Sequence, residues 1–206
     1  MRRRGFPPSP PGPYPLFETW RRAAEARDGI RYAGAMTLST IAADGFPEGR
    51  TVLLHAAEAE RGFAFITDVR SRTGRALAQA PRAALTFYWG PLERQVRVQG
   101  RVTRAPSREA DRFFAKRPRR SRITVWASPQ SRPLGDAAAL EERMATLDER
   151  FSERETIPRP PYWRAYRVRP RRVAFWEAKA RRLHARVEYE RSESATGDWR
   201  IRRLAP

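Results

Sequence analysis

The chain of 206 residues contains no cysteine, which excludes disulfide bonds and thiolate metal sites. Its two histidines, His55 and His184, leave a zinc site short of ligands when cysteine is absent. The sequence has no Gly-x-Ser-x-Gly motif, so the usual hydrolase nucleophile is not indicated. Gly-x-Gly-x-x-Gly and P-loop patterns are also absent, which argues against the usual nucleotide-binding folds. An enzyme without these groups is expected to take its chemistry from an organic cofactor.

Long apolar runs are also absent, so we expect no transmembrane helix and no membrane partner. Prolines follow the N-terminal arginines Arg2–Arg4 where a secretory signal needs an apolar helix, and a cytoplasmic location is therefore expected. Lysine occurs only at Lys116 and Lys179, so nearly all of the 42 basic residues are arginine, and the formal net charge is +19. Because the arginines are scattered and accompany no recognition motif, we expect no specific nucleic-acid partner, and part of the charge suits anionic small molecules.

The pattern of apolar residues predicts many short strands and few helices. Residues 1–14 are rich in proline and are expected to form a disordered tail, and residues 15–206 a single domain. Helices are predicted at 15–27, 71–79, 107–116 and 136–151. Strands are predicted at 35–42, 50–55, 63–67, 83–89, 95–103, 162–169, 173–176, 186–190 and 199–204. Because strands and helices do not alternate regularly, the expected class is mainly β with helices (α+β), built as a small barrel with helical decoration.

Two segments in the first half of the chain carry groups that suit a cofactor. The strand at 50–55 begins with Arg50 and ends with His55, a pattern that surface charges flanking a core strand also explain. Thr67 closes the next strand, and the arginines and serine of 70–75 crowd into the following helix start. Hydroxyls, guanidinium groups and free helix N–H groups together make a phosphate seat. Further along, Gln95 enters a strand and offers both a donor and an acceptor to the edge of a ring.

Two later segments suit a ligand. Arg117 and Ser121 lie on either side of Pro118, in a predicted loop whose guanidinium and hydroxyl groups suit the binding of an anion. Near the C-terminus, Phe175 and Trp176 precede the sequence Arg-Arg-Leu-His-Ala-Arg at 181–186. If that segment is extended, Arg182 and His184 face one way and Leu183 the other. A guanidinium and an imidazole on one face, beside a tryptophan, suit a flat, anionic, heteroaromatic ligand.

These segments, taken in order and at their spacing from about Ala35 to Pro206, resemble the pyridoxamine 5′-phosphate oxidase family of FMN-dependent enzymes. The matching motifs are Arg-x-Val-Leu-Leu at 50–54, Leu-Glu-Arg-Gln-Val at 92–96, Arg-Pro-Arg-x-Ser at 117–121, Gln-Ser at 130–131, Phe-Trp at 175–176 and Arg-Leu-His-x-Arg at 182–186. The resemblance implies a split β-barrel homodimer that binds two FMN molecules at the subunit interface.

The resemblance also assigns roles by motif position. It implies that FMN is held by Arg50, Thr67, Arg72, Gln95, Gln130, Ser131, Trp176 and Arg186. It implies that the substrate faces His55, Phe113, Arg117, Ser121, Arg182 and His184. The implied catalytic pair is Arg182, which orients the substrate ring, and His184, which hydrogen-bonds a ring substituent; no metal is implied. In the family reaction a hydride passes from a substrate carbon to flavin N5, and O2 then reoxidises the flavin and yields H2O2.

Three positions depart from the family pattern. His55 stands where a lysine helps to hold the substrate phosphate, Phe113 where a tyrosine supplies a hydroxyl, and Thr73 where a lysine lies beside the flavin phosphate. Losing the first two contacts would weaken phosphate binding by roughly 2–4 kcal/mol, of which a protonated His55 would recover a part. Arg117 and Ser121 remain, so the flavin site is expected to be largely intact and the substrate-phosphate site only half so.

Three hypotheses therefore stay open. Four residues that match the family pattern favour a pyridoxine/pyridoxamine 5′-phosphate oxidase that makes pyridoxal phosphate: Arg117, Ser121, Arg182 and His184. His55 and Phe113 favour a family relative that oxidises another compound in secondary metabolism, as in phenazine biosynthesis. The Arg-Leu-His motif does not separate these two. The third hypothesis is a non-catalytic barrel that binds flavin or nucleic acid.

Overall fold

The computed structural model describes residues 10–134, 136–192 and 198–205, and the side chains of Ala137 and Arg182 lie outside the described part. The strands are β1 (Ala35–Ile41), β2 (Pro47–Leu53), β3 (Ala56–Glu58), β4 (Gly62–Asp68), β5 (Arg82–Trp89), β6 (Arg94–Arg104), β7 (Trp163–Glu177), β8 (Ala185–Arg191) and β9 (Trp199–Leu204). The α-helices are α1 (Pro13–Glu25), α2 (Arg72–Gln79), α3 (Ser107–Ala115), α4 (Arg119–Ala127) and α5 (Ala137–Arg150). Two short 3₁₀ turns are η1 (Gly90–Leu92) and η2 (Ala180–Arg182). In this part of the chain no helix combines the length and the apolar character needed to cross a bilayer.

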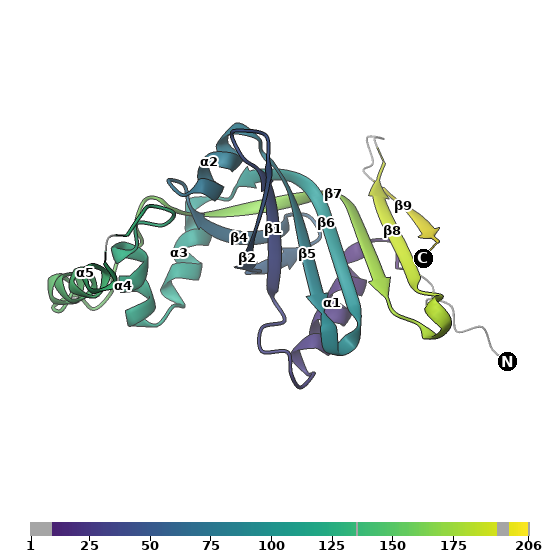
Figure 1. Ribbon diagram of the computed structural model, residues 1–206, viewed down its shortest axis with the longest axis horizontal. Helices are drawn as coiled ribbons and strands as arrows, with labels where there is room; N and C mark the ends of the chain where they lie inside the picture. The colour runs from purple at the N-terminus through teal and green to yellow at the C-terminus, as the bar shows by residue number, and fades with distance from the viewer. Residues whose placement is uncertain (1–9, 135, 193–197, 206) are drawn as a thin grey trace.

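The long strand β7 joins the two parts of a nine-stranded antiparallel sheet (Figure 1). The strand order is β2-β1-β5-β6-β7-β4-β3, and β8 pairs with β7 and with β9. On the edge of β7 that does not face β6, residues 163–168 pair with β4, whereas residues 172–177 pair with β8. The same strand therefore belongs to the curled sheet and to the C-terminal hairpin.

The change of partner falls at Pro170, which has no N–H to donate to a neighbouring strand. The register of β6 against β7 shifts between Gln99 and Gly100, which marks a β-bulge. Only glycine fits at this point, because a Cβ atom at Gly100 would lie 2.0 Å from the carbonyl oxygen of Arg169. A bulge bends its strand, so the first half of β7 turns toward β4 and the second half continues beside β8.

The inner face of the curled sheet forms the main core, where Phe87 and Phe175 are buried with their neighbours. Helix α1 covers this core because Phe17 and Trp20 lie on its apolar face. The Phe17 ring centroid lies 5.0 Å from that of Phe63 and 5.1 Å from that of Phe87, and Trp20 meets Phe175 edge-on at 5.3 Å. Aromatic contacts at these distances anchor the helix on the sheet.

A second core lies where α3, α4 and α5 pack against β4 and β7, at the left of Figure 1. Ala64 and Ala165 of the strands are buried there with Phe113 and Phe114 of α3. Because this core covers one face of β4 and the main core covers the other, almost every residue of β4 is buried. Met144 and Leu147 of α5 pack in this cluster, together with the buried Phe151 that follows the helix.

The predicted class, mainly β with helices in a barrel-like sheet, is confirmed. Helix α1 begins at Pro13, so the last two residues of the expected tail are helical, and residues 1–9 lie outside the described part. The strands predicted at 162–169 and 173–176 are one strand, β7, because the proline between them sits at the bulge and does not end the strand.

Two local predictions around the site residues are wrong. The loop expected around Pro118 is the corner between two helices, because Pro118 is the N-cap of α4 and Ser121 lies in its first turn. The segment at 182–184 is not extended: it begins with the last residue of the turn η2, in which Arg181 has a left-handed φ of 59°. The strand β8 begins only at Ala185, so the alternation expected for Arg182, Leu183 and His184 does not apply.

A buried ion pair ties α3 to β7. The Arg167 guanidinium donates to Glu109 Oε2 from Nε at 2.9 Å and from Nη2 at 2.7 Å, and only 5% and 3% of these two side chains is exposed. Arg167 also lies 3.2 Å from Glu58, and Arg61 pairs with the other oxygen of Glu109. Removing one partner of such a pair leaves an uncompensated buried charge.

We therefore expect Glu109→Ala to lower the free energy of unfolding by about 3–5 kcal/mol, measured by urea denaturation. The matched control is Asp148→Ala, which removes the partner of Arg119 in a pair whose side chains are 58% and 44% exposed. That variant should lose less than about 1 kcal/mol, because water screens the pair. Equal losses in the two variants would contradict the importance of the buried pair.

Candidate functional site

Three of the predicted cofactor residues lie in one row across the sheet. Gln95 of β6 is opposite Trp176 of β7, and Trp176 is opposite Arg186 of β8. Directly opposed residues of antiparallel strands point to the same face. The residues beside them, Val96 and Phe175, are buried in the main core, so the row lies on the other face of the sheet. An amide, an indole and a guanidinium are thus presented side by side, a flat platform with polar edges.

A second group gathers two guanidinium groups around one carboxylate. Arg50 of β2 donates to the carbonyl of Leu38 at 3.2 Å, to Thr40 Oγ1 at 2.6 Å and to Glu48 Oε2 at 2.8 Å. Arg72, at the start of α2, reaches the other oxygen of Glu48 at 3.6 Å with a side chain that is 71% exposed. The predicted phosphate-binding arginines therefore lie close together, with Glu48 between them.

The turn between β4 and α2 is held tightly beside this group. Thr67 is buried, and its Oγ1 lies 3.2 Å from Ser71 Oγ. Ser71 caps α2 by accepting from the Gly74 N–H at 3.1 Å, and its hydroxyl donates to the Asp68 carbonyl at 2.6 Å. Thr73, which stands where the family has a lysine, is uncharged and its side chain is buried in α2. It therefore adds no positive charge to this site.

The Gln130–Ser131 pair lies against the same turn. Gln130 Oε1 accepts from the Asp68 N–H at 3.4 Å, which connects residues 62 positions apart. Ser131 has a left-handed φ of 65°, a conformation that costs energy for a residue other than glycine. The pair is thereby brought to the group formed by Arg50, Thr67 and Arg72.

Four of the predicted substrate residues form one cluster. His55 lies just after β2, and its ring centroid is 4.8 Å from that of Phe113 on α3. At the corner of α3 and α4, Arg117 Nη2 donates to Ser121 Oγ at 3.0 Å. The two departures from the family pattern, His55 and Phe113, are therefore in contact with each other and lie beside the two intact residues.

The charges in this cluster suit an anion. Burial, together with the nearby Arg117, lowers the pKa of His55 from 6.5 to about 4, so its imidazole is neutral at pH 7. Burial also lowers the pKa of Arg117, which has no ion-pair partner among the described residues, and its buried Nε has no hydrogen-bond partner there. A half-buried cation without a counter-ion is an attractive partner for a negatively charged ligand.

His184 lies next to the row of Gln95, Trp176 and Arg186. Its ring centroid is 5.0 Å from that of Trp176, and its Nδ1 accepts from the Lys179 N–H at 3.3 Å. The side chain of Arg182, predicted to orient the substrate, lies outside the described part, so its role remains a prediction. Arg186 extends to the C-terminal segment and donates to the Ala205 carbonyl at 3.2 Å.

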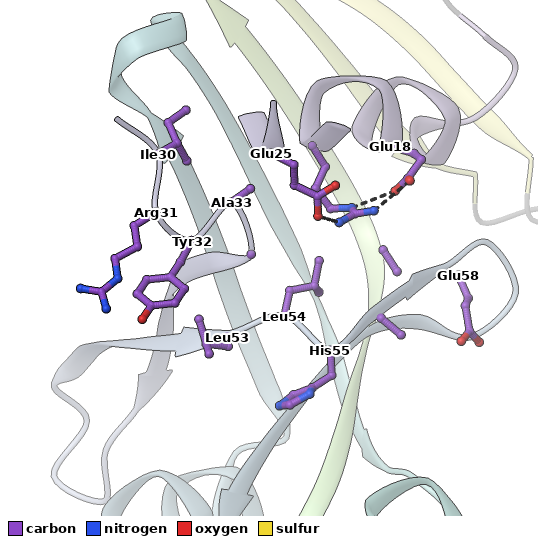
Figure 2. A pocket seen from close by; sticks show the side chains of 14 residues that line it. Glu18, Glu25, Ile30, Arg31, Tyr32, Ala33, Leu53, Leu54, His55 and Glu58 are labelled. Atoms are coloured by element: carbon purple, nitrogen blue, oxygen red, sulfur yellow. Dashed lines mark hydrogen bonds and ion pairs between the residues drawn. The ribbon is translucent and has the colours of Figure 1, made fainter. Parts of the chain in front are cut away.

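A pocket of about 610 Å³ opens beside the substrate cluster, between α1 and residues 30–34 and 53–58 (Figure 2). Figure 2 shows His55 at the end of the pocket that lies away from Glu18 and Glu25. Among the predicted substrate residues whose side chains are described, only His55 lines this pocket. His55 therefore borders both the pocket and the cluster around Arg117.

The predicted site residues thus fall into two groups within one chain. The first gathers the phosphate seat on β2, β4 and α2 with the substrate cluster on α3 and α4. The second is the row on β6, β7 and β8 with His184. In Figure 1 the helices α2, α3 and α4 lie toward the left of the molecule, whereas the C-terminal hairpin of β8 and β9 lies at the right.

Sequence reasoning missed Glu48, which bridges Arg50 and Arg72. Glu48 precedes Arg50 by two residues in the same strand, so the alternation of side chains already placed both on one face. It also missed Glu177, which follows Trp176 and binds Arg94 and Lys179. No local sequence pattern predicts that Glu177 contacts Arg94 and Lys179.

Comparison with known proteins gives one consistent result. Residues 23–151 match the family described as pyridoxamine 5′-phosphate oxidase, and residues 163–206 match the pyridoxine 5′-phosphate oxidase C-terminal dimerisation region. The chain is 46% identical over 194 residues to a pyridoxine/pyridoxamine 5′-phosphate oxidase of Salinibacter ruber, covering 94% of this chain and 89% of that protein. A protein of the same name from Burkholderia cenocepacia is 44% identical over 196 residues, covering 95% and 90%.

Two solved structures share the fold. PhzG from Burkholderia lata, in complex with tetrahydrophenazine-1-carboxylic acid, superimposes with a TM-score of 0.88 at 30% identity and covers 97% of this chain and 95% of that one. An FMN-binding protein of Nostoc punctiforme related to pyridoxamine 5′-phosphate oxidase gives a TM-score of 0.74 at 18% identity, covering 96% and 100%. The second likeness shows the fold alone, and both confirm the predicted split β-barrel.

The depressed pKa of His55 predicts a pH-dependent stability. The unfolded chain binds a proton at this residue below pH 6.5, whereas the folded chain does so only near pH 4. Folding is therefore not penalised above pH 6.5, and stability falls as the pH drops from 6.5 toward 4. Between pH 7 and 4.5 the wild-type holoprotein should lose about 2 kcal/mol more than His55→Gln, measured by urea denaturation at both pH values. Carboxylates titrate alike in the two proteins, so equal losses would rule out His55 as the source.

Proposed function

Because the chain belongs to the pyridoxamine 5′-phosphate oxidase family, we propose that this FMN-dependent oxidoreductase oxidises pyridoxine or pyridoxamine 5′-phosphate. The observation that carries the proposal is the Arg117–Ser121 pair, a half-buried cation without a counter-ion among the described residues and next to a hydroxyl. The names of relatives that are 44–46% identical over most of the chain support the same substrate. Membership of an enzyme family leaves the hypothesis of a non-catalytic barrel without support.

The residues of both groups fit FMN. Arg50, Arg72 and the capped start of α2 offer guanidinium and N–H donors to a phosphate. The row of Gln95, Trp176 and Arg186 offers a flat surface and polar edges to a tricyclic ring. When bound, FMN supplies the electron acceptor of the reaction, which O2 later reoxidises with release of H2O2.

The chain's own residues bind and orient the substrate. Arg117 and Ser121 hold the phosphate, His184 hydrogen-bonds a ring substituent, and Arg182 lies over the substrate ring by motif position. No side chain of the cluster needs to act as a strong acid, because the cofactor accepts the electrons. The contribution of these residues is positioning, which aligns the reacting carbon with the flavin.

The separation of the two groups supports a site completed by a second subunit. One group lies at the helical side of the chain and the other on β6, β7 and β8, where Trp176 and Arg186 fall within the region that matches the family's dimerisation region. Each FMN would then be held by the phosphate seat of one subunit and the row of its partner. Two such sites follow from the twofold symmetry of a homodimer.

A second candidate substrate class is favoured by His55 and Phe113. Their contact replaces two polar groups of the family pattern with a neutral imidazole and an apolar ring. A site with fewer cationic contacts discriminates less strongly for a phosphate dianion. A relative with 30% identity, PhzG, is described in complex with a carboxylic acid, so a carboxylate-bearing aromatic compound is the alternative.

Turnover tests the proposal. The wild type should bind FMN and release H2O2 with pyridoxine 5′-phosphate, and the double variant His55→Lys with Phe113→Tyr should lower the KM for it by roughly tenfold or more by restoring a charge-assisted contact. Unphosphorylated pyridoxine is the matched control, and its KM should stay unchanged. An unchanged KM for the phosphate ester, with oxidation of a carboxylate-bearing aromatic compound, would favour the second candidate.

Mixing two defective variants tests the shared site. Arg50→Ala impairs the phosphate seat and Arg186→Ala impairs the row, so each homodimer should bind FMN weakly. Unfolding and refolding an equal mixture of the two variants should produce mixed dimers, each with one intact FMN site. Random pairing makes about half of the dimers mixed, so roughly a quarter of the wild-type number of tight sites should return. FMN titration measures the recovery. No recovery would mean that each site is built within one chain.

A further inference from the structure

The hydrogen bond at His184 Nδ1 selects one tautomer of its neutral imidazole ring. A backbone N–H can only donate, so the contact from the Lys179 N–H at 3.3 Å makes His184 Nδ1 an acceptor. In the neutral imidazole the proton must then lie on Nε2, which is the nitrogen left to meet a ligand. The ring is also fixed against Trp176, with centroids 5.0 Å apart.

Glu177 binds the side chain of Lys179, the residue that supplies this N–H. Its Oε2 lies 2.5 Å from Lys179 Nζ, and its Oε1 accepts from Arg94 Nε at 2.9 Å and from Nη2 at 2.8 Å. The backbone adds a bond from the Ala178 N–H to the Glu93 carbonyl at 3.0 Å. These contacts hold residues 177–179 against the start of β6, where the chain leaves β7 and turns toward His184.

The same carboxylate lies behind the row of Gln95, Trp176 and Arg186, on the face of the sheet that also carries Phe175. Glu177 is next to Trp176 in β7 and directly opposite Arg94, the neighbour of Gln95 in β6. Arg94 is itself held over the Trp20 ring of α1 at 4.8 Å. Burial acts to raise the pKa of Glu177, but Lys179 and Arg94 hold it below its ordinary value, so the carboxylate is charged at neutral pH.

From these contacts we propose that Glu177 is a positioning residue: it holds the Lys179 N–H against His184 Nδ1, so that His184 meets the substrate as an Nε2–H donor. The site then favours a substrate with a hydrogen-bond acceptor, such as a ring oxygen substituent, at the point facing His184. The consequence for turnover rests on the proposed oxidase function, whereas the tautomer is a property of the protein without substrate.

Nitrogen-15 NMR of the imidazole rings tests the tautomer directly. The chain has two histidines, so the spectrum of the FMN-bound His55→Gln variant contains only His184. We expect the shifts of a protonated Nε2 and an unprotonated Nδ1 in this protein. In the same background, Glu177→Gln should shift the signals toward a mixture of tautomers. A protonated Nδ1 in the parent protein, or unchanged signals in Glu177→Gln, would overturn the proposal.

Kinetics separate positioning from a general structural role. In a protein that carries the natural His55, Glu177→Gln should lower kcat about tenfold, which corresponds to the loss of about one hydrogen bond. The affinity for FMN should change less than about twofold. The matched control is Glu188→Gln on β8, whose partner Arg172 lies 3.5 Å away, and it should keep the wild-type kcat.

The two proposals fail in distinguishable ways. If no tested substrate is oxidised but the Nε2 tautomer and its dependence on Glu177 are found, the positioning role stands and the proposed substrate does not. If turnover is found while Glu177→Gln lowers kcat and FMN affinity equally, with a matching loss of thermal stability, Glu177 is structural and the positioning proposal is wrong.

Discussion

The exchange of neighbours along β7 is the constraint on which the architecture depends. Its first half pairs with β4 within the curled sheet, and its second half pairs with β8 and supports the C-terminal hairpin. Two backbone facts permit the exchange, the absence of an N–H at Pro170 and the absence of a Cβ at Gly100. Because β6 stays paired along most of β7, Gln95, Trp176 and Arg186 remain in one row despite the break.

Most of the fold could be predicted from the sequence, because alternating apolar residues in strands and capping residues or prolines at helix ends are local signals. The helix α4 was missed, because Pro118 and the three arginines around it at 117–120 suggest a loop, although Pro118 is well placed to precede a helix. That β7 is one continuous strand was missed for a different reason. Pro170 usually ends a strand, and only its position at a bulge opposite Gly100, more than sixty residues away, makes it compatible with this one.

The candidate site could be predicted as a set of residues but not as an arrangement. Motif order identified Arg50, Arg72, Gln95 and Trp176, and the fold brings them into the two groups described above. The contact between His55 and Phe113 has no counterpart in the sequence, because it joins the end of β2 to α3 across the second core. The ionisation of His55 likewise depends on burial, which is a property of the folded chain.

The placement of His55 and Phe113 has a consequence for how such a chain diversifies. Both lie outside the β6–β7–β8 row, one in the connection after β2 and the other on a helix of the second core. Substitutions there alter the polarity around Arg117 without disturbing the backbone pairing that aligns Gln95, Trp176 and Arg186. In the proposed site, substitutions at these two positions would therefore change which substrate is accepted without moving the residues proposed to hold FMN.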